Sequence, residues 1–487
     1  MERLRVSEDG RRLVTESGAP FFYLADTAWT LPQRLKWDDA LEYLNRRKLQ
    51  GFTAVQLVAL VPERDADMRN PAGIPALHDD DPLRPNEGYL RYLDWVITAA
   101  EHLGLYVLLV PVWGQLVVGD NWGGTQFPKT VGEHNAYGVG EWIGSRYRDR
   151  PNIIWCLGGD RQPIHKGTDY RDVWRRMAEG LAAGATGIAA RHDQPSPAWD
   201  QLLITYHTCY EMESGEYSSM SYWSDDEAWL SFVALQSGHG SATRNFAAVE
   251  KEIGRDRRRP VIDIEPAYER MPMNWPVLLP LHDDVIVRKR AYWSLLAGAA
   301  GHTYGHASVW CMISEKERDE VLSSSWFEAL DHPGAHQMTI VRNLVESTSF
   351  ERWTPAQGML AHADECGDDC LGHHRQAARD VDGHFALVYL TDGGSERVDL
   401  SGLTGEQLFA EWLDPRDGRH VDLSHRESDE PTPVDARGVF TFGAPSFGEG
   451  DDWLLLIGDD PAWLRAAGQP QTWGEPLQAT EMSMIWA

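Results

Sequence analysis

Two carboxylates stand out in the sequence because each ends a short apolar run. Asp160 follows the run IIWCLGG, and Glu265 closes the run VIDIE just before a proline. Two carboxyl groups that flank one bond can cleave a glycosidic linkage, because one protonates the leaving oxygen while the other attacks or activates water. The alternative is a salt-bridged or capping role, since Arg161 follows Asp160 directly. We expect the pair to be catalytic.

Two further acids lie close to Glu265 in the sequence. Asp263 shares a strand face with Glu265, and we expect it to be a buried structural acid paired with a cation. Glu269 follows in the next loop, where it either positions substrate or is solvated.

Histidines also gather at the ends of apolar runs. His207, His239, His302 and His306 could hold zinc or iron together with carboxylates. However, the sequence contains no HxH or HExxH spacing. A polyhydroxylated substrate needs neutral donors and acceptors of this kind. We therefore expect sugar-binding histidines with no metal and no cofactor, and a metal-dependent hydrolase is an alternative.

Tryptophan is unusually frequent, with 21 residues in the chain. Trp both fills large cores and stacks on the apolar faces of sugar rings, so carbohydrate is the first substrate class to consider. A carbohydrate-binding barrel without catalytic activity is the second alternative. The predicted substrate-binding residues are Asp26, Trp29, Gln56, Trp113, His207, His239, Tyr304, His306 and Trp310.

The elements that must position these residues are eight buried-looking apolar runs that alternate with helical patterns. This alternation is typical of strand-helix units around a parallel sheet. Eight repeats between residues 21 and 343 favour a (β/α)8 barrel, in which residues at the carboxyl ends of the strands line the active-site mouth. The predicted strands begin at Phe21, Thr53, Leu105, Asn152, Leu202, Ser231, Pro260 and His302.

Three further segments flank the predicted barrel. Residues 1–20 contain two short strands around Asp9-Gly10, a pair that favours a tight hairpin turn. Residues 344–460 show short alternating strands separated by turn signals, which is typical of an antiparallel β-sandwich. Residues 461–487 have no clear period, and we expect this tail to pack back on one of the domains.

The composition makes some classes of binding partner unfavourable. The 487 residues include 45 Lys and Arg against 74 Asp and Glu, which gives a formal net charge of −29. Such a surface repels nucleic acid and anionic membranes, and no apolar run is long enough to span a bilayer. The chain shows no secretory signal, and its five Cys do not read as a disulfide framework, so we expect a cytoplasmic location. The segment from Cys366 to His374 could hold zinc, but we favour an acidic loop.

Several motifs together resemble one known family. PFFYLADTAWTL, GFTAVQL, IIWCLGGD, LLITYH, QSGH, VIDIEPAYE and HTYGHASVW resemble the catalytic barrel of the apiosidase-like glycoside hydrolases, family 140. AEWLDPRDG and DWLLLIG resemble the C-terminal sandwich of that family, which is labelled a collagen-binding domain.

The resemblance implies a fold, an activity and two roles. The family combines a (β/α)8 barrel with a β-sandwich, and its known activity is the release of D-apiose, a branched furanose, from plant glycans by a retaining mechanism without a metal. It implies that Asp160 is the general acid/base and that Glu265 is the nucleophile. The long insert GATGIAARHDQPSPAWDQ before the fifth strand departs from the pattern and could reshape the rim of the pocket.

Overall fold

The computed structural model describes residues 1–61, 68–122, 125–210, 216–274, 280–361, 372–427, 430–434 and 437–486. Eight parallel strands form one sheet with the order β12-β9-β6-β5-β4-β15-β14-β13. The first strand along the chain, β4, therefore pairs with both the second and the eighth, as barrel closure requires. The strands are β4 (Tyr23–Thr27), β5 (Ala54–Leu60), β6 (Tyr106–Val112), β9 (Ile153–Gly158), β12 (Ile204–His207), β13 (Val233–Leu235), β14 (Val261–Asp263) and β15 (Gly301–Tyr304).

The gap between β12 and β13 is bridged outside the regular ladder. The Ser231 N–H donates to the Ile204 carbonyl at 2.8 Å, and the Thr205 hydroxyl donates to the Phe232 carbonyl at 2.7 Å. The predicted (β/α)8 barrel is confirmed, with all eight predicted strands in place.

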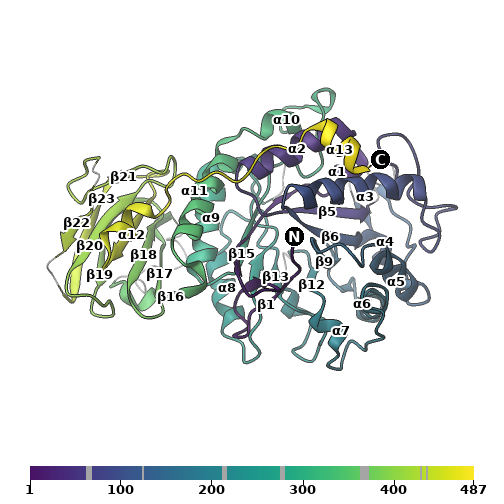
Figure 1. Ribbon diagram of the computed structural model, residues 1–487, viewed down its shortest axis with the longest axis horizontal. Coiled ribbons are helices and arrows are strands. Elements are labelled where there is room, and N and C mark those ends of the chain that lie inside the picture. The colour runs from purple at the N-terminus through teal and green to yellow at the C-terminus, as the bar shows by residue number, and fades with distance from the viewer. Residues whose placement is uncertain are drawn as a thin grey trace.

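Helices surround the barrel (Figure 1). They are α1 (Leu31–Arg34), α2 (Trp37–Leu49), α3 (Glu87–His102), α4 (Gln115–Val118), α5 (Ala136–Arg146), α6 (Arg171–Thr186), α7 (Pro197–Asp200), α8 (Asn245–Ile253), α9 (Asp284–Leu296), α10 (Trp326–Ala329) and α11 (Pro333–Ser347). Two short ribbons lie in the loops after β6 and β9, namely β7 (Asn121–Trp122) with β8 (Thr125–Gln126) and β10 (Ile164–His165) with β11 (Thr168–Asp169).

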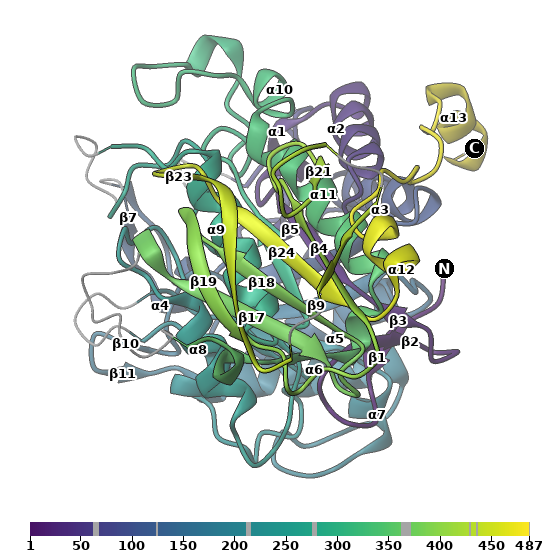
Figure 2. The ribbon, with the colours of Figure 1, turned by 90° about the vertical axis from the view of Figure 1, so that its left-hand side faces the viewer.

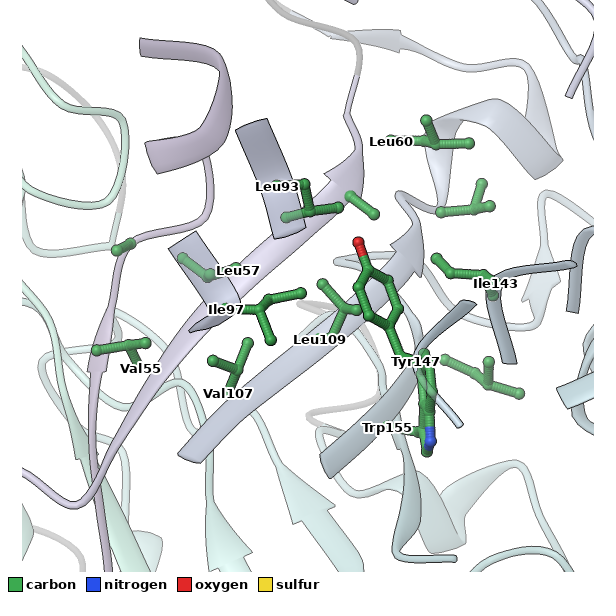
Figure 3. Close-up of a cluster of buried hydrophobic side chains, with 14 of the residues drawn as sticks. Val55, Leu57, Leu60, Leu93, Ile97, Val107, Leu109, Ile143, Tyr147 and Trp155 are labelled. Carbon is green, nitrogen blue, oxygen red and sulfur yellow. The ribbon is translucent and has the colours of Figure 1, made fainter. Parts of the chain in front are cut away.

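The core between strands and helices explains why the barrel strands read as continuous apolar runs. Every residue of β5 and β6 is buried, because one face of each strand fills the barrel and the other packs against helices. Figure 3 shows the outward-facing set: Val55, Leu57, Val107 and Leu109 meet Leu93 and Ile97 of α3 and Ile143 of α5.

The N-terminal hairpin closes one end of the barrel. β1 (Leu4–Val6) pairs with β2 (Leu13–Thr15), which pairs with β3 (Pro20–Phe21). The hairpin is confirmed, but its turn is a six-residue loop over residues 7–12, wider than the predicted tight turn, and in it Gly10 takes a positive φ of 73° whereas Asp9 does not. Leu4 and Leu13 pack in one cluster with Ile154 and Phe232 of the barrel interior. The hairpin is therefore part of the barrel core.

The C-terminal domain is the predicted antiparallel β-sandwich. One sheet runs β16-β17-β18-β24-β20-β21, with β22 also paired to β20, and a second sheet pairs β19 with β23. The strands are β16 (Trp353–Pro355), β17 (Arg375–Asp380), β18 (Phe385–Leu390), β19 (Gly393–Asp399), β20 (Leu408–Leu413), β21 (His420–Val421), β22 (Thr432–Val434), β23 (Val439–Phe447) and β24 (Trp453–Gly458).

The larger sheet of the sandwich is buried on both faces. In β18, Val388 packs with Phe442 of the smaller sheet, whereas Leu387 faces the barrel helices and packs with Trp293 and Leu344. Figure 2 views the molecule from the sandwich side, with these helices behind the sheet. Because strand side chains alternate between faces, the sandwich and the barrel share one apolar interface.

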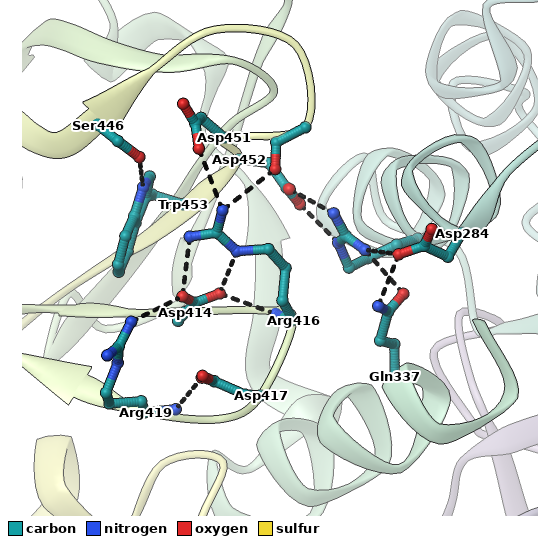
Figure 4. Close-up of polar contacts among 12 residues, drawn as sticks. Asp284, Gln337, Asp414, Arg416, Asp417, Arg419, Ser446, Asp451, Asp452 and Trp453 are labelled. Atoms are coloured by element: carbon teal, nitrogen blue, oxygen red, sulfur yellow. Dashed lines mark hydrogen bonds and ion pairs between the residues drawn. The ribbon is translucent and has the colours of Figure 1, made fainter. Parts of the chain in front are cut away.

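A buried ion pair crosses the same interface. Arg288 of α9 donates to both carboxylate oxygens of Asp452, from Nε at 2.8 Å and from Nη2 at 2.5 Å. The Tyr389 hydroxyl donates to Asp452 at 2.7 Å, and Arg288 also reaches Gln337 of α11 at 2.7 Å. Figure 4 shows Asp452 on the sandwich side of this cluster, with Gln337 and Asp284 on the barrel side. Arg288 and Asp452 are fully buried, so each charge depends on its partner.

The C-terminal tail contacts both domains. It contains α12 (Pro461–Ala466), whose Leu464 is buried in the sandwich–barrel cluster, and α13 (Ala479–Trp486). Between them, the Leu477 N–H donates to the Asn45 side chain of α2 at 2.8 Å. Figure 1 shows this segment running back from the sandwich to the barrel. Within the described residues, no helix is both long and apolar enough to cross a membrane.

Candidate active site

A strained turn delivers Asp160 to the mouth of the barrel. β9 ends at Gly158 (φ 89°), and Gly159 (φ 98°) and Asp160 (φ 53°) continue in the left-handed region. A Cβ on Gly158 would lie 2.2 Å from the His207 carbonyl oxygen, so a side chain cannot fit there. Non-glycine residues in this region cost free energy and cluster at functional sites. The double glycine therefore places the carboxylate of Asp160 beside the next strand.

His207, the last residue of β12, connects the two candidate carboxylates. The backbone N–H of Asp160 donates to His207 Nδ1 at 2.7 Å. Since Nδ1 is an acceptor, the proton of the neutral ring belongs on Nε2, which lies 2.8 Å from Glu265 Oε2. The imidazole thus donates to Glu265 and fixes the backbone that carries Asp160.

Glu265 is a buried carboxylate that is held ionised. Burial opposes ionisation, but the hydrogen bond from His207, the nearby imidazoles of His207 and His239, and a hydrogen bond from Gln236 outweigh it, so the pKa of Glu265 lies below its ordinary value. Its side chain retains only 9% exposure. A desolvated, ionised carboxylate is suited to nucleophilic attack.

Asp160 is more open than Glu265, with 27% of its side chain exposed. Its Oδ1 accepts a hydrogen bond from Gln236 Nε2 at 2.9 Å, and its Oδ2 lies 3.0 Å from Arg161 Nη1. Arg161 also contacts Asp120 at 3.1 Å, so the guanidinium is shared between two acids. An exposed carboxyl at the mouth can exchange a proton with a leaving group and with water.

Aromatic rings surround this pair. Trp29 and Trp113 lie 5.4 Å and 5.8 Å from the His207 ring, measured between centroids, and they contact each other. On the other side, His239 Nε2 lies 3.9 Å from Glu265 Oε1 and its ring packs edge-on against Tyr268. Burial lowers the pKa of His239, which favours the neutral ring. The structure therefore brings together six predicted residues: Asp160, Glu265, His207, His239, Trp29 and Trp113.

The structure corrects the prediction for Asp26 and Tyr304. These residues are register partners on β4 and β15, and both side chains point away from the barrel toward the helices. Asp26 is fully buried and accepts from Arg47 Nε at 2.6 Å, whereas the Tyr304 hydroxyl donates to Glu269 at 2.6 Å. Strand residues alternate between faces, so a place near a strand end does not by itself put a side chain in the mouth.

Gln56 and His306 are also engaged away from the carboxylate pair. Gln56 lies inside the barrel in mid-strand, where it donates to the Tyr23 hydroxyl and to Thr303. His306 is buried, and its Nε2 contacts His332 at 2.9 Å. Neither meets the prediction of a substrate contact. Trp310 is partly buried and packs beside Tyr268, and its contact with substrate stays a prediction.

The two neighbouring acids are structural. Asp263 accepts hydrogen bonds from Ser237 at 2.7 Å and Asn245 at 3.1 Å, and the expected cation is the nearby buried guanidinium of Arg290, which favours its ionised form; burial outweighs these groups and raises the pKa of Asp263 to about 6. Glu269 accepts from Tyr304 and from the Gly334 N–H, and burial raises its pKa to about 7. Neither reaches the Asp160–Glu265 pair.

Two residues of the site were missed in the sequence. Gln236 directly follows β13, and Tyr268 follows Glu265 in the next loop. Gln236 fits the strand-end rule, because it is the first residue after β13, whereas the prediction named His239 three residues later.

In the part of the chain that the structure describes, no group of three or more His, Cys, Asp or Glu side chains is arranged to hold a metal ion. Both ring nitrogens of His207 are engaged in the contacts above. For the predicted loop from Cys366 to His374, residues 362–371 lie outside the described residues, while His374 stacks on Phe246 at 3.8 Å.

Comparisons with known proteins agree with this geometry. A family model described as an apiosidase-like catalytic domain matches residues 7–352, and one described as a collagen-binding domain of a collagenase matches residues 354–458. No curated protein resembles the chain closely enough to count as a match.

Two solved structures are similar over nearly the whole chain. One is described as a glycoside hydrolase family 5 protein from Bacteroides vulgatus ATCC 8482, with 28% identity, a TM-score of 0.78, and coverage of 94% of this chain and 93% of that chain. The other is described as a glycoside hydrolase, with 29% identity, the same TM-score, and coverage of 94% and 97%. Both span the barrel and the sandwich together.

Proposed function

Because the chain belongs to the apiosidase-like family of glycoside hydrolases, we propose that it is a retaining enzyme that releases D-apiose or a related furanose from plant-derived glycosides or oligosaccharides. The observation that carries this proposal is the contact of His207 with both acids: it donates to the Glu265 carboxylate and accepts from the Asp160 backbone. One acid is thereby buried and ionised, and the other is open to solvent.

In the first step, Glu265 attacks the anomeric carbon while Asp160 gives its proton to the leaving oxygen. The bond between sugar and leaving group breaks, and an ester forms between sugar and Glu265. In the second step, Asp160 takes a proton from water, the hydroxide oxygen bonds to the anomeric carbon, and Glu265 leaves as a carboxylate. The two inversions restore the original configuration. This scheme requires the two carboxyl groups to lie about 5–5.5 Å apart.

The surrounding residues suit a small sugar. Trp29 and Trp113 are buried against His207 and form an apolar wall beside Glu265, and His239 offers a neutral ring edge. A furanose presents small apolar patches together with several hydroxyl groups, which these side chains complement. We place the sugar between the two tryptophans and His239, with its anomeric carbon facing Glu265.

A panel of glycosides tests the proposal. The purified chain is incubated with aryl apiosides, arabinofuranosides, galactofuranosides and glucopyranosides, and the released sugar is measured by chromatography. We expect release from the apiosides, with weaker or no release from the pyranosides, and none by a Glu265→Gln variant. Release from pyranosides alone would contradict the furanose assignment.

A further inference from the structure

Gln236 occupies a position between the two acids. It lies directly after β13 and is 5% exposed, and it was not among the predicted site residues. Its backbone N–H donates to the Tyr217 carbonyl at 2.8 Å, its side-chain Oε1 accepts from the Tyr210 N–H, and its Nε2 donates to Asp160 Oδ1 at 2.9 Å. Gln236 thus links the segment after β12 to Asp160, which lies just after β9.

The Tyr210 contact fixes which way the amide faces. Because Oε1 already accepts a backbone N–H, the NH2 end must point toward the carboxylates. That end donates to Asp160 Oδ1 at 2.9 Å, and it also faces Glu265, whose ionised form it favours. A single oriented donor therefore stands between the two groups whose separation decides the mechanism.

We propose that Gln236 is a positioning residue that sets the place of Asp160 relative to Glu265, an inference that rests on the proposed function. A neutral amide can donate to Oδ1 whether or not Asp160 carries its proton on the other oxygen. The contact therefore persists while Asp160 acts first as acid and then as base. Arg161 already offers a cation to Oδ2, so a second cation at position 236 would favour the ionised form further, whereas an apolar side chain would leave Oδ1 without its donor.

Other charged and titratable groups also face Asp160, and a test must separate their effects on catalysis from that of Gln236. Arg161 is bonded to its Oδ2, and His207 to its backbone. Among the described residues, Cys209, His239 and Tyr268 also interact electrostatically with Asp160, and Glu265 completes the pair.

The experiment compares Gln236→Glu and Gln236→Ala with the intact chain on two furanosides of the same sugar, one with a good aryl leaving group and one with an alkyl leaving group. Gln236→Glu keeps the shape and the acceptor for Tyr210 but adds negative charge. Gln194→Glu adds the same charge at an exposed residue of the insert before β12, which enters the strand at the amino end of the barrel and not at the rim of the pocket as expected. Thermal melting of each variant verifies folding.

We expect Gln236→Ala to lower kcat about 10- to 100-fold on the alkyl glycoside and less on the aryl glycoside, with little change in KM. Gln236→Glu should move both limbs of the pH profile of kcat/KM to higher pH, because added negative charge disfavours ionisation of both carboxyl groups. Gln194→Glu should leave both limbs in place.

Equal losses on both substrates with unmoved pH limbs would show that Gln236 is only structural and would overturn the inference. An intact chain that cleaves no furanoside would instead refute the proposed function on which the inference rests. The two failures are therefore distinguishable.

Discussion

Two buried polar clusters in this chain stabilise their carboxylates in different ways. At the barrel–sandwich interface, Asp452 receives two hydrogen bonds from the guanidinium of Arg288, so each buried charge is neutralised by its opposite. In the site cluster, Glu265 is held by the imidazole of His207 and the amide of Gln236. Neutral donors stabilise a carboxylate without cancelling its charge. The first arrangement stabilises the packing of two domains, and the second keeps a carboxylate available to react.

The largest expected effect comes from removing the reactive charge. Glu265→Gln keeps the shape and an acceptor for His207 but loses the nucleophile, so we expect kcat to fall roughly 10⁴-fold or more while the melting temperature changes little. Glycoside turnover and circular dichroism melting measure both quantities. The control is Glu269→Gln, a buried acid outside the site, which should retain turnover. Comparable turnover in Glu265→Gln and the intact chain would show that the reaction does not need the charge of Glu265, and the proposed difference between the two clusters would be wrong.

Asp160→Asn tests the second carboxyl group of the site. Without a proton to give, the variant should lose about 10²- to 10⁴-fold in kcat on glycosides with poor leaving groups. Aryl glycosides with good leaving groups need little protonation and should lose much less. Steady-state kinetics on a series of leaving groups measures the difference, and equal losses across the series would contradict the role of acid.

Disrupting the Arg288–Asp452 pair should lower the stability of the fold and leave the catalytic steps unchanged. Asp452→Ala removes the buried carboxylate that accepts two hydrogen bonds from Arg288 and leaves the guanidinium with the partly exposed Asp284 as its acidic partner, so we expect the free energy of unfolding to fall by up to about 3–5 kcal/mol. Denaturant unfolding gives this value. The matched control is Asp169→Ala, which removes the exposed partner of Arg171 and should cost less than about 1 kcal/mol. Equal effects of the two variants would show that burial of the interface pair is unimportant.

The smallest effect concerns His207. Replacing it by Ala removes one donor to Glu265 and one acceptor for the Asp160 N–H, at a cost of about 1–3 kcal/mol, or roughly 5- to 150-fold in kcat/KM. Since the lowered pKa of Glu265 depends on this donor, the acidic limb of kcat/KM should move to higher pH. The intact chain should keep the stabilisation from ionised Glu265 above its ordinary pKa and lose it as the pH falls through the lowered value. An unmoved acidic limb would contradict the account of the site.

Apolar runs were sufficient to predict the eight strands, because strands buried on both faces leave a continuous signal. The strand-end rule then found Asp160, Glu265, His207 and His239. It was wrong for Asp26 and Tyr304, because the face on which a side chain lies depends on the register, and a shift of one residue reverses it. Both residues instead contribute to the layer between barrel and helices, where Arg47 binds Asp26.

The Arg288–Asp452 cluster could not be predicted from the sequence, for a different reason. Arg288 and Asp452 are far apart in the sequence, and each alone reads as a surface charge. The apolar continuity of FALVYL and WLLLIG did contain a signal, since an exposed sandwich face would alternate with polar residues. That continuity marks a sheet covered on both sides, as the barrel helices show.

The most direct test of the central claim is the mass of the peptide that contains Glu265 after incubation with a fluorinated furanoside, which slows hydrolysis of the sugar ester. The account predicts an added mass equal to one fluorosugar on Glu265, and it predicts no adduct in the Glu265→Gln variant. An adduct on another residue, or complete substrate turnover with no adduct at any time, would contradict a retaining mechanism through Glu265.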